Sequence, residues 1–195
     1  MRAHITAEID GSAKIGENFV IWANSEVREA VQIGNDVSIG RNVYIGPGVV
    51  IGNGVRIQNN ACIYEPCQIG NNVFIGPNVV LTNDRFPRIV FSDGTRRTNG
   101  NWEPQPVIIE DNVSLGANTT CIAGIRIGSW SMVGASSVVT RNIPNYSLSY
   151  GNPAKEIYRI DENGEKLLVI SHSEFYSQSQ DNYYKLGGNL NLERL

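Results

Sequence analysis

Aliphatic residues recur at every sixth position through the first part of this chain. Thirteen consecutive positions follow the spacing: Ile9, Ile15, Ile21, Val27, Ile33, Ile39, Ile45, Ile51, Ile57, Ile63, Ile69, Ile75 and Leu81. An α-helix repeats about every 3.6 residues and a strand every 2, so neither produces a strict period of six. A short unit that stacks on its own copies does produce it, and units of this length are typical of β-helices.

A second small or apolar residue precedes each of these aliphatic residues by two positions, as Val37, Val43 and Val49 do. Because residues i and i−2 of a strand share a face, each repeat is expected to be a short strand with two inward side chains, then a corner. Glycine follows seven of the aliphatic residues. It suits a corner where a Cβ would crowd the chain or where φ must be positive. Three repeats would complete a triangular coil that rises about 4.8 Å.

The period of six fails once, between Leu81 and Ile109. A second run follows at Ile109, Leu115, Cys121, Ile127, Val133 and Val139, but the gap before it is 28 residues, which is not a multiple of six. The intervening segment is polar, and its aromatic residues argue against disorder. We therefore expect β-helix coils over 1–81 and 107–143, with an inserted active-site loop over 82–106.

The segment 144–195 is expected to form a C-terminal appendage. Pro144 and Pro153 end the regular coil, and Asn163-Gly164 lies between two apolar stretches, which predicts a hairpin turn. A short helix is predicted over residues 174–185, ahead of a Gly-Gly break. A cap on the end of the coil or a contact in a trimer would account for this appendage.

Composition narrows the classes of function. A net charge of −3 and a pI of about 5.4 argue against a nucleic-acid partner. No long apolar segment or signal peptide is evident, so we expect a cytoplasmic protein without a membrane partner. The cysteines lack metal-site spacing; Cys67 and Cys121 fall on inward columns and are expected to pack as small apolar residues, while Cys62 is more accessible.

Three segments carry a resemblance to a known family. They are RIQNNACIYEPCQIGNNVFIGP at 56–77, the loop opening TNDRFPR at 82–88, and GANTTCIAGIRIG at 116–128 with VGASSVVTRNIPNYSLSYGNPAK at 133–155. The chain resembles the hexapeptide-repeat sugar-nucleotide N-acyltransferases, in particular those that act on UDP-linked 3-amino-2,3-dideoxyglucuronate or dTDP-linked 3-amino-3,6-dideoxyhexoses. The resemblance implies an all-β, left-handed parallel β-helix, although parallel crossovers are generally right-handed.

The resemblance implies that Asn83 orients the reacting amine and that Asp84 accepts its proton or pairs with the ammonium group. The alternative for both residues is a turn, since Asn and Asp favour loop starts by bonding to nearby backbone.

Histidine is missing from the regular coil, because His4 and His172 both lie outside it. A hydroxyl nucleophile would need a base, whereas an amine with a pKa near 8 is partly neutral at pH 7. The sequence therefore favours N-acylation over O-acylation. The same absence excludes a zinc site of the carbonic anhydrase kind, and we expect no metal.

The resemblance also implies a groove for acetyl-CoA, the acyl donor. It assigns contacts with the cofactor to Ala117, Gly134, Ala135, Ser136, Arg141 and Lys155, and an oxyanion-binding backbone N–H to either Ala117 or Ala135. Arg141 and Lys155 would meet the phosphates; the alternative is that both are ordinary surface charges.

The sugar nucleotide, linked to UDP or dTDP, is the remaining expected ligand. The residues assigned to it are Arg28, Asn59, Asn60, Tyr64, Arg85 and Arg88. The outward asparagines could instead form side-chain ladders, and the sequence does not decide whether Arg96 and Arg97 bind a sugar carboxylate or are solvated.

The expected function is acetylation of the amino group, at C3, of a nucleotide-linked sugar for surface-polysaccharide biosynthesis. The resemblance implies a homotrimer with the site between subunits. A 4-amino sugar or a longer acyl-CoA is the alternative within this class. A structural or binding β-solenoid is the alternative outside it, although the varied outward residues lack the repetitive flat face of such proteins.

Overall fold

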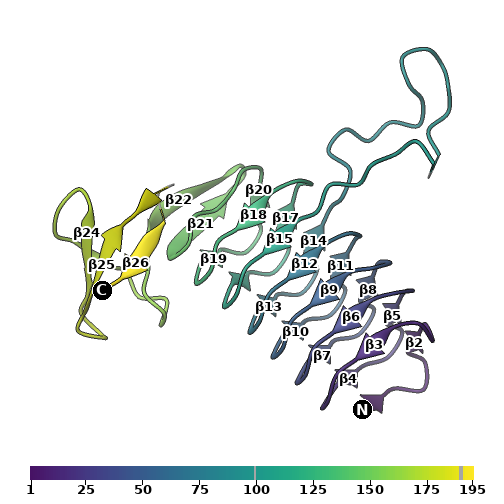
Figure 1. Ribbon diagram of the computed structural model, residues 1–195, viewed down its shortest axis with the longest axis horizontal. Coiled ribbons are helices and arrows are strands. Elements are labelled where there is room, and N and C mark those ends of the chain that lie inside the picture. Colours follow the sequence, from purple (N-terminus) through teal and green to yellow (C-terminus); the bar gives the residue numbers. More distant parts are fainter. Residues whose placement is uncertain (99, 189–190) are drawn as a thin grey trace.

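The computed structural model describes residues 1–98, 100–188 and 191–195. Most of these residues wind into a row of stacked coils, each with three short strands (Figure 1). The coils form the expected left-handed parallel β-helix of hexapeptide repeats. The period of six predicted the β-helix correctly, and its left hand is the one that the family resemblance implied.

The strands form three faces, which the chain visits in turn. The first face holds β1 (Arg2–Ala3), β4 (Val20–Ile21), β7 (Ser38–Ile39), β10 (Arg56–Ile57), β13 (Phe74–Ile75), β16 (Ser114–Leu115), β19 (Met132–Val133), β21 (Ser147–Gly151) and β22 (Ala154–Arg159). The second face holds β2 (Glu8–Ile9), β5 (Glu26–Val27), β8 (Tyr44–Ile45), β11 (Cys62–Ile63), β14 (Val80–Leu81), β17 (Thr120–Cys121) and β20 (Val138–Val139). The third face holds β3 (Lys14–Ile15), β6 (Gln32–Ile33), β9 (Val50–Ile51), β12 (Gln68–Ile69), β15 (Ile108–Ile109) and β18 (Arg126–Ile127).

Three edges join the faces. The first edge connects the first face to the second, at residues 22–24, 40–42, 58–60, 76–78, 116–118 and 134–136. The second edge connects the second face to the third, at residues 28–30, 46–48, 64–66, 82–84, 122–124 and 140–142. The third edge returns to the first face, at residues 16–18, 34–36, 52–54, 70–72, 110–112 and 128–130.

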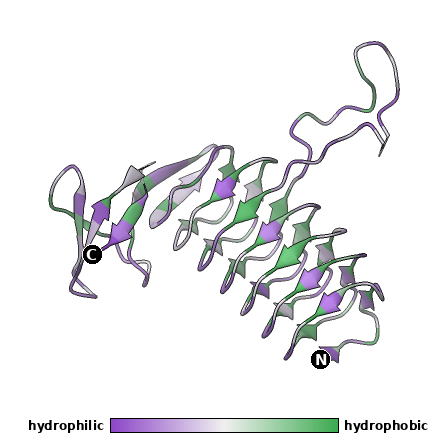
Figure 2. Ribbon diagram, in the orientation of Figure 1, coloured by the Kyte–Doolittle hydropathy of each residue, from purple (hydrophilic) through white to green (hydrophobic). Residues whose placement is uncertain are grey.

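Aliphatic side chains fill the inward positions of the coil, and hydrophobic and hydrophilic stretches alternate along the coils in Figure 2. Ile39, Ile45 and Val79 are fully buried. Cys67 and Cys121 are buried as predicted and Cys62 is only partly so. Burial raises the pKa of the Cys121 thiol to about 12, so the two inward cysteines are packing residues.

Crowding explains the corner glycines. A Cβ on Gly40 would lie 2.6 Å from Asn59 Oδ1 and 2.7 Å from Asn59 N in the next coil, a distance that no side chain tolerates. Positive φ falls two residues later in the corner, as at Asn42 with φ 54° and Asn60 with φ 61°. Asparagine is among the few residues with a side chain that adopt this region readily. Of the two roles considered for these glycines, close stacking is the one observed.

β21 and β22 of the expected appendage extend the first face of the coil, and the rest of it forms a fourth, antiparallel sheet of β23 (Leu168–Val169), β24 (Glu174–Ser177), β25 (Asn182–Leu186) and β26 (Leu192–Arg194). The helix predicted over 174–185 is wrong, because these residues form β24 and β25. The turn at Asn163-Gly164 is confirmed: Gly164 has φ 81° and donates to Asp161 O at 3.0 Å.

A small separate core joins this sheet to the end of the coil. The Tyr146 and Tyr184 rings lie 5.3 Å apart, and Leu167 and Leu192 pack with them. The Asn145 amide donates to Leu192 O at 2.9 Å and accepts from Leu192 N at 2.8 Å. The appendage therefore covers the last coil, which supports the interpretation of a cap.

Candidate active site

The insertion leaves and rejoins the coil at the second edge. Thr82 still belongs to the coil, since its backbone N–H and its hydroxyl both donate to Cys121 O at 3.0 Å. Asn83 O then accepts from Gln105 N at 2.8 Å, so the two ends of the loop meet. The loop projects away from the stacked coils (Figure 1). A bridge between Val90 and Arg96 gives it structure of its own.

A cavity of about 360 Å³ lies inside the insertion, beside the start of the loop. Its lining residues are Asp84, Arg85, Phe86, Phe91, Arg97, Gly100, Asn101, Trp102, Glu103 and Gln105. Charged, amide and aromatic groups thus face one space, which suits a polar ligand with a ring.

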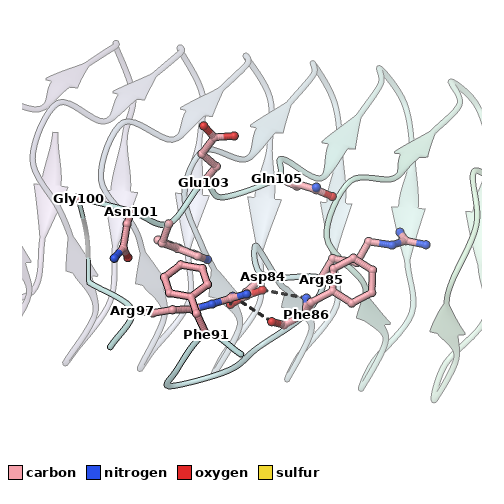
Figure 3. Close-up of a pocket in the computed structure, with 10 residues that line it drawn as sticks. Asp84, Arg85, Phe86, Phe91, Arg97, Gly100, Asn101, Glu103 and Gln105 are labelled. Carbon is pink, nitrogen blue, oxygen red and sulfur yellow. Dashed lines mark hydrogen bonds and ion pairs between the residues drawn. The ribbon is translucent and has the colours of Figure 1, made fainter. Parts of the chain in front are cut away.

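Arg97 organises this cavity. Its Nη1 donates to Phe86 O at 3.1 Å, and its guanidinium carbon lies 4.9 Å from the centre of the Phe91 ring. Nη1 is also 3.9 Å from Asp84 Oδ2. Figure 3 shows these groups gathered together, with Arg85 pointing away from them. The Arg97 Nε is buried and has no hydrogen-bond partner among the described residues.

Asp84 forms the turn that was considered for it, and it also faces the cavity. Its Oδ1 accepts from Phe86 N at 2.9 Å, which forms the turn, and its other oxygen faces Arg97. A carboxylate held in this way is oriented, but its charge is already partly balanced by the guanidinium.

Asn83 is half-buried, and its side-chain amide forms no hydrogen bond within the described residues. Strands β11 and β14 are in register with Ile63 beside Leu81. Asn83 therefore stacks above Glu65, one coil further along the second edge. Its amide is a free donor and acceptor at the point where the loop begins.

Arg85, which also lines the first cavity, and Arg88 are more exposed than Arg97. Arg85 and Arg88 are exposed; Arg85 Nη1 donates to Ala123 O at 3.2 Å. Arg88 lines a second cavity of about 250 Å³ that it shares with Asp84, Arg97 and Trp102. Arg96 contributes its backbone oxygen to Asn101 Nδ2 at 3.3 Å and does not line either cavity.

Arg28 and Tyr64 share the second edge with Asn83. Arg28 Nε lies 2.9 Å from Glu29 Oε2 and 3.5 Å from Glu26 Oε1. The hydrogen bond and charge of Glu29 raise the pKa of Arg28. Tyr64 is exposed, and its ring centre is 5.5 Å from that of Tyr44. Both residues project outward, toward solvent at the second edge.

Asn59 and Asn60 lie on the first edge and take part in side-chain ladders. Asn59 Oδ1 accepts from Arg41 N at 2.8 Å. Asn60 accepts from Asn42 Nδ2 and donates to Asn78 Oδ1, both at 3.0 Å. Both ends of the Asn60 amide and the Asn59 oxygen are bonded to neighbouring coils, so a ligand that binds these atoms would compete with the fold.

The residues assigned to acetyl-CoA lie mainly on the first edge as well. Ala117 and Ala135 have backbone N–H groups that no described residue accepts, because the next coil places no side-chain oxygen above them. Ser136 has φ 58° and donates its N–H to Ala117 O at 2.8 Å. A Cβ on Gly134 would lie 2.8 Å from Tyr150 Cβ. Packing alone therefore requires a glycine at position 134.

Arg141 and Lys155 are exposed, on the second edge and on β22. Neither forms an ion pair within the described residues. Their charges are therefore free to meet phosphate groups.

The structure divides the expected site between two edges. Asn83, Asp84 and the insertion lie on the second edge, whereas Ala117 and the segment 134–136 lie on the first. The whole second face separates them. A single chain therefore does not bring the amine-orienting residues and the free amides together.

Both histidines lie away from the insertion. The expectation that His4 lies outside the coil is wrong, because it follows β1 at the first edge and its backbone N–H donates to Ile21 O of the next coil at 3.0 Å. Its Nδ1 lies 3.0 Å from Thr6 Oγ1. His172 is exposed between β23 and β24. Across the described ranges, no group of three His, Cys, Asp or Glu side chains could hold a metal ion. Those residues also contain no helix with the length and hydropathy needed to span a membrane.

Two family models match the coil. The bacterial transferase hexapeptide (six repeats) model matches residues 12–47 and 48–83. The model of the hexapeptide repeat of succinyl-transferase matches residues 30–65 and 106–141. Together the matches cover more than half of the chain.

Curated relatives match over shorter stretches. Over 48 residues the chain is 56% identical to dTDP-3-amino-3,6-dideoxy-alpha-D-galactopyranose 3-N-acetyltransferase of Aneurinibacillus thermoaerophilus, which is 25% of each chain. Over 58 residues it is 41% identical to 2,3,4,5-tetrahydropyridine-2,6-dicarboxylate N-acetyltransferase of Brevibacillus brevis, which is 30% of this chain and 25% of that protein. The chain thus spans about a quarter of the length of these relatives.

Solved structures share the fold. A hexapeptide-repeat acetyltransferase from Vibrio cholerae, complexed with acetyl coenzyme A, has a TM-score of 0.51 and 24% identity, over 80% of this chain and 70% of that one. A mutant N-acyltransferase from Bacillus cereus, complexed with dTDP-4-amino-4,6-dideoxyglucose and coenzyme A, has a TM-score of 0.63 and 20% identity, over 76% and 83% of the two chains. The stacked coils and the two family matches lead to one conclusion: this chain belongs to the bacterial hexapeptide-repeat transferases.

Proposed function

We propose that this protein is an acetyl-CoA-dependent N-acetyltransferase that acylates the amino group, at C3, of a nucleotide-linked sugar. The observation that carries the proposal is the free amide of Asn83, placed where the insertion and its polar cavity begin. The 56% identity over 48 residues to a 3-N-acetyltransferase of a dTDP-linked amino sugar supports this substrate class. A role in building surface polysaccharides follows from that substrate class.

The reaction proceeds by direct attack. The neutral amine attacks the thioester carbonyl, a C–N bond forms, and the C–S bond then breaks to release CoA thiolate. Asn83 orients the amine, and holding the two reactants at contact distance can offset several kcal/mol of the barrier. The N–H of Ala117 or Ala135 stabilises the oxygen that gains negative charge. The thiolate takes up the proton that the nitrogen loses.

We propose further that the working form is a homotrimer with shared sites. The second edge of one chain would supply Asn83 and the insertion, and the first edge of a neighbour would supply the free amides. The separation of these groups by the second face in a single chain supports this arrangement. Arg141 and Lys155, with their unpaired charges, would meet the phosphates of CoA or of the sugar nucleotide.

The test is thiol release from acetyl-CoA with a panel of dTDP- and UDP-linked 3-amino and 4-amino sugars. The matching 3-hydroxy sugar nucleotides are the control, because they lack the amine. We expect release with a 3-amino sugar and none above hydrolysis with the control. Absence of release with every amino sugar would refute the proposed activity, and faster release with a 4-amino sugar or a longer acyl-CoA would correct its specificity.

A mixing experiment tests the shared site. Asn83→Ala impairs the second edge, and proline at whichever of Ala117 and Ala135 is the oxyanion donor impairs the first, so each variant alone is expected to be nearly inactive. When the two are unfolded together and refolded as a mixture, some sites combine two intact edges and activity returns. A mixture no more active than its components would exclude sites shared in this way.

A further inference from the structure

The edges of the coil follow a hydrogen-bonding rule. The second residue of a corner donates its backbone N–H to the side-chain oxygen of the Asn or Asp one coil further on. Glu17 N bonds to Asn35 Oδ1 at 2.7 Å, Arg41 N to Asn59 Oδ1 at 2.8 Å, and Asn71 N to Asp111 Oδ1 at 2.7 Å. In each case the accepting oxygen lies over the corner glycine of the earlier coil.

Glu65 occupies this position on the second edge, but it has no donor. Its Oε2 lies 2.6 Å from the place of a Cβ on Gly46, as Asn59 Oδ1 does over Gly40. The donor in this corner would be residue 47, which is Pro47 and has no N–H. Oε2 is consequently buried without a hydrogen-bond partner among the described residues.

Asn83, one coil further on, also departs from the rule. An asparagine here would normally accept from the backbone N–H of Glu65, but neither group forms that bond. Glu65 and Asn83 therefore occupy the same position in two consecutive coils, and neither side chain forms the hydrogen bond that this position normally makes. A buried polar group without a partner destabilises a protein, so its presence calls for a ligand or a role in chemistry.

Glu65 interacts electrostatically with Tyr44, which lies on β8 of the second face. Burial raises the pKa of Tyr44, and the charge of Glu65 adds to this rise. The other Glu65 oxygen, Oε1, also has no partner but is not buried. The carboxylate therefore has one buried oxygen and one open oxygen, and neither is hydrogen-bonded within the described residues.

We propose that Glu65 and Asn83 together form the subsite for the attacking amine, with Glu65 Oε1 accepting a hydrogen bond from its N–H. This inference rests on the proposed N-acetyltransferase function and adds a catalytic residue to it. As the C–N bond forms, the nitrogen gives its proton to Glu65. The C–S bond then breaks, and Glu65 passes the proton to the departing thiolate, which returns the carboxylate to its starting state.

The first experiment separates turnover from binding. Glu65→Gln keeps the shape of the side chain and removes its ability to take up a proton. We expect kcat with the amino sugar to fall by about 10²-fold, while KM changes by less than about threefold. A kcat within about threefold of the wild type would overturn the proposal.

The second experiment restores the hydrogen bond that is missing between residues 47 and 65. Pro47→Ala combined with Glu65→Asn supplies the missing N–H and a standard acceptor, so the corner gains the bond seen at Arg41 and Asn59. Pro77→Ala is the matched control for loss of a proline, because residue 117 above it is Ala117, which has no acceptor. We expect the double variant to melt higher than the Pro77→Ala variant and yet to lose kcat as Glu65→Gln does.

A double variant with native kcat would show that Glu65 has only a structural role. This failure is distinct from failure of the proposed function, which would appear as no thiol release by the wild-type protein with any amino sugar. Thermal melting and thiol release on the same preparations provide both readouts.

Discussion

The same substitution at two asparagines is expected to have opposite effects. Asn71 accepts at Oδ1 from Asn53 N at 2.9 Å and from Asn53 Nδ2 at 3.1 Å, and it donates to Asp111 Oδ1 at 3.2 Å. Asn71→Ala removes all three hydrogen bonds. At about 0.5–1.5 kcal/mol each, reduced by their exposure to solvent, the loss of unfolding free energy is about 1–3 kcal/mol. Turnover should stay unchanged, since Asn71 lies on the third edge.

Asn83→Ala removes no hydrogen bond within the described residues, so its cost in stability should be below about 0.5 kcal/mol. Turnover should fall by about 10²-fold, a typical loss when one group that orients a reactant is removed. Urea unfolding followed by fluorescence measures the first quantity, and thiol release from acetyl-CoA measures the second. If Asn83→Ala destabilises the protein as much as Asn71→Ala, or leaves kcat intact, Asn83 is a structural residue and the reasoning fails.

Three further predictions address the free amides, the buried carboxylate and the thiols. Pro47 and Pro77 already occupy the second position of a corner, so Ala117→Pro and Ala135→Pro should fold. The variant that removes the oxyanion donor should lower kcat by about 10²–10³-fold. Undiminished kcat values in both variants would exclude both amides. Burial alone would raise the pKa of Asp161, but hydrogen bonds from Ser177, from Ser179 and from two backbone N–H groups outweigh it and hold the pKa below its usual value. The ionised Asp161 therefore stabilises the fold above the unfolded pKa of about 3.9, and this stabilisation is lost as pH falls through the folded value. Asp161→Asn should flatten the dependence of melting temperature on pH below about 4. An unchanged slope would contradict this. A thiol reagent should modify Cys62 in the folded protein and reach the buried Cys67 and Cys121 only after unfolding; three thiols reacting at one rate would contradict the packing.

Much of the coil was predictable because its constraint is local and repeated. A residue two places before each aliphatic position must share its face, so the inward columns follow from spacing alone. The preference of asparagine for positive φ was open to the same reasoning, since Asn42, Asn60 and Asn78 recur at one point of the corner.

The tail was predicted incorrectly because its apolar residues alternate rather than follow a helical period. Phe175 and Ser177 face inward on β24, and Tyr184 is buried on β25. The Tyr176 and Tyr183 rings meet across the strands at 4.9 Å, and Asp181 takes φ 52° at the turn. Cross-strand aromatic pairs of this kind stabilise a hairpin more than the helix propensity of the segment stabilises a helix.

The site was only partly accessible from sequence. Asn83 and Asp84 stood out because the period fails beside them. The contact between Arg97 and Phe91 depends on how the loop folds on itself, which no periodicity encodes. Glu65, which we propose as the proton acceptor, was not predicted, although a signal exists: the residue one coil earlier is a proline, which lacks the N–H that the corner rule requires.

The meeting of the loop ends at Asn83 and Gln105 implies that the insertion is a detachable module. Excision of residues 84–105 would join Asn83 to Pro106 and leave the sequence Leu-Thr-Asn-Pro-Val-Ile-Ile, in which six positions separate Leu81 from Ile109 and the inward Val107 keeps its place. The junction would repeat the order found at Tyr64, Glu65, Pro66 and Cys67. The insertion therefore adds its polar cavity to a continuous solenoid without breaking the stack, and its deletion should return a folded scaffold that keeps Glu65 and Asn83 but has lost the cavity beside them.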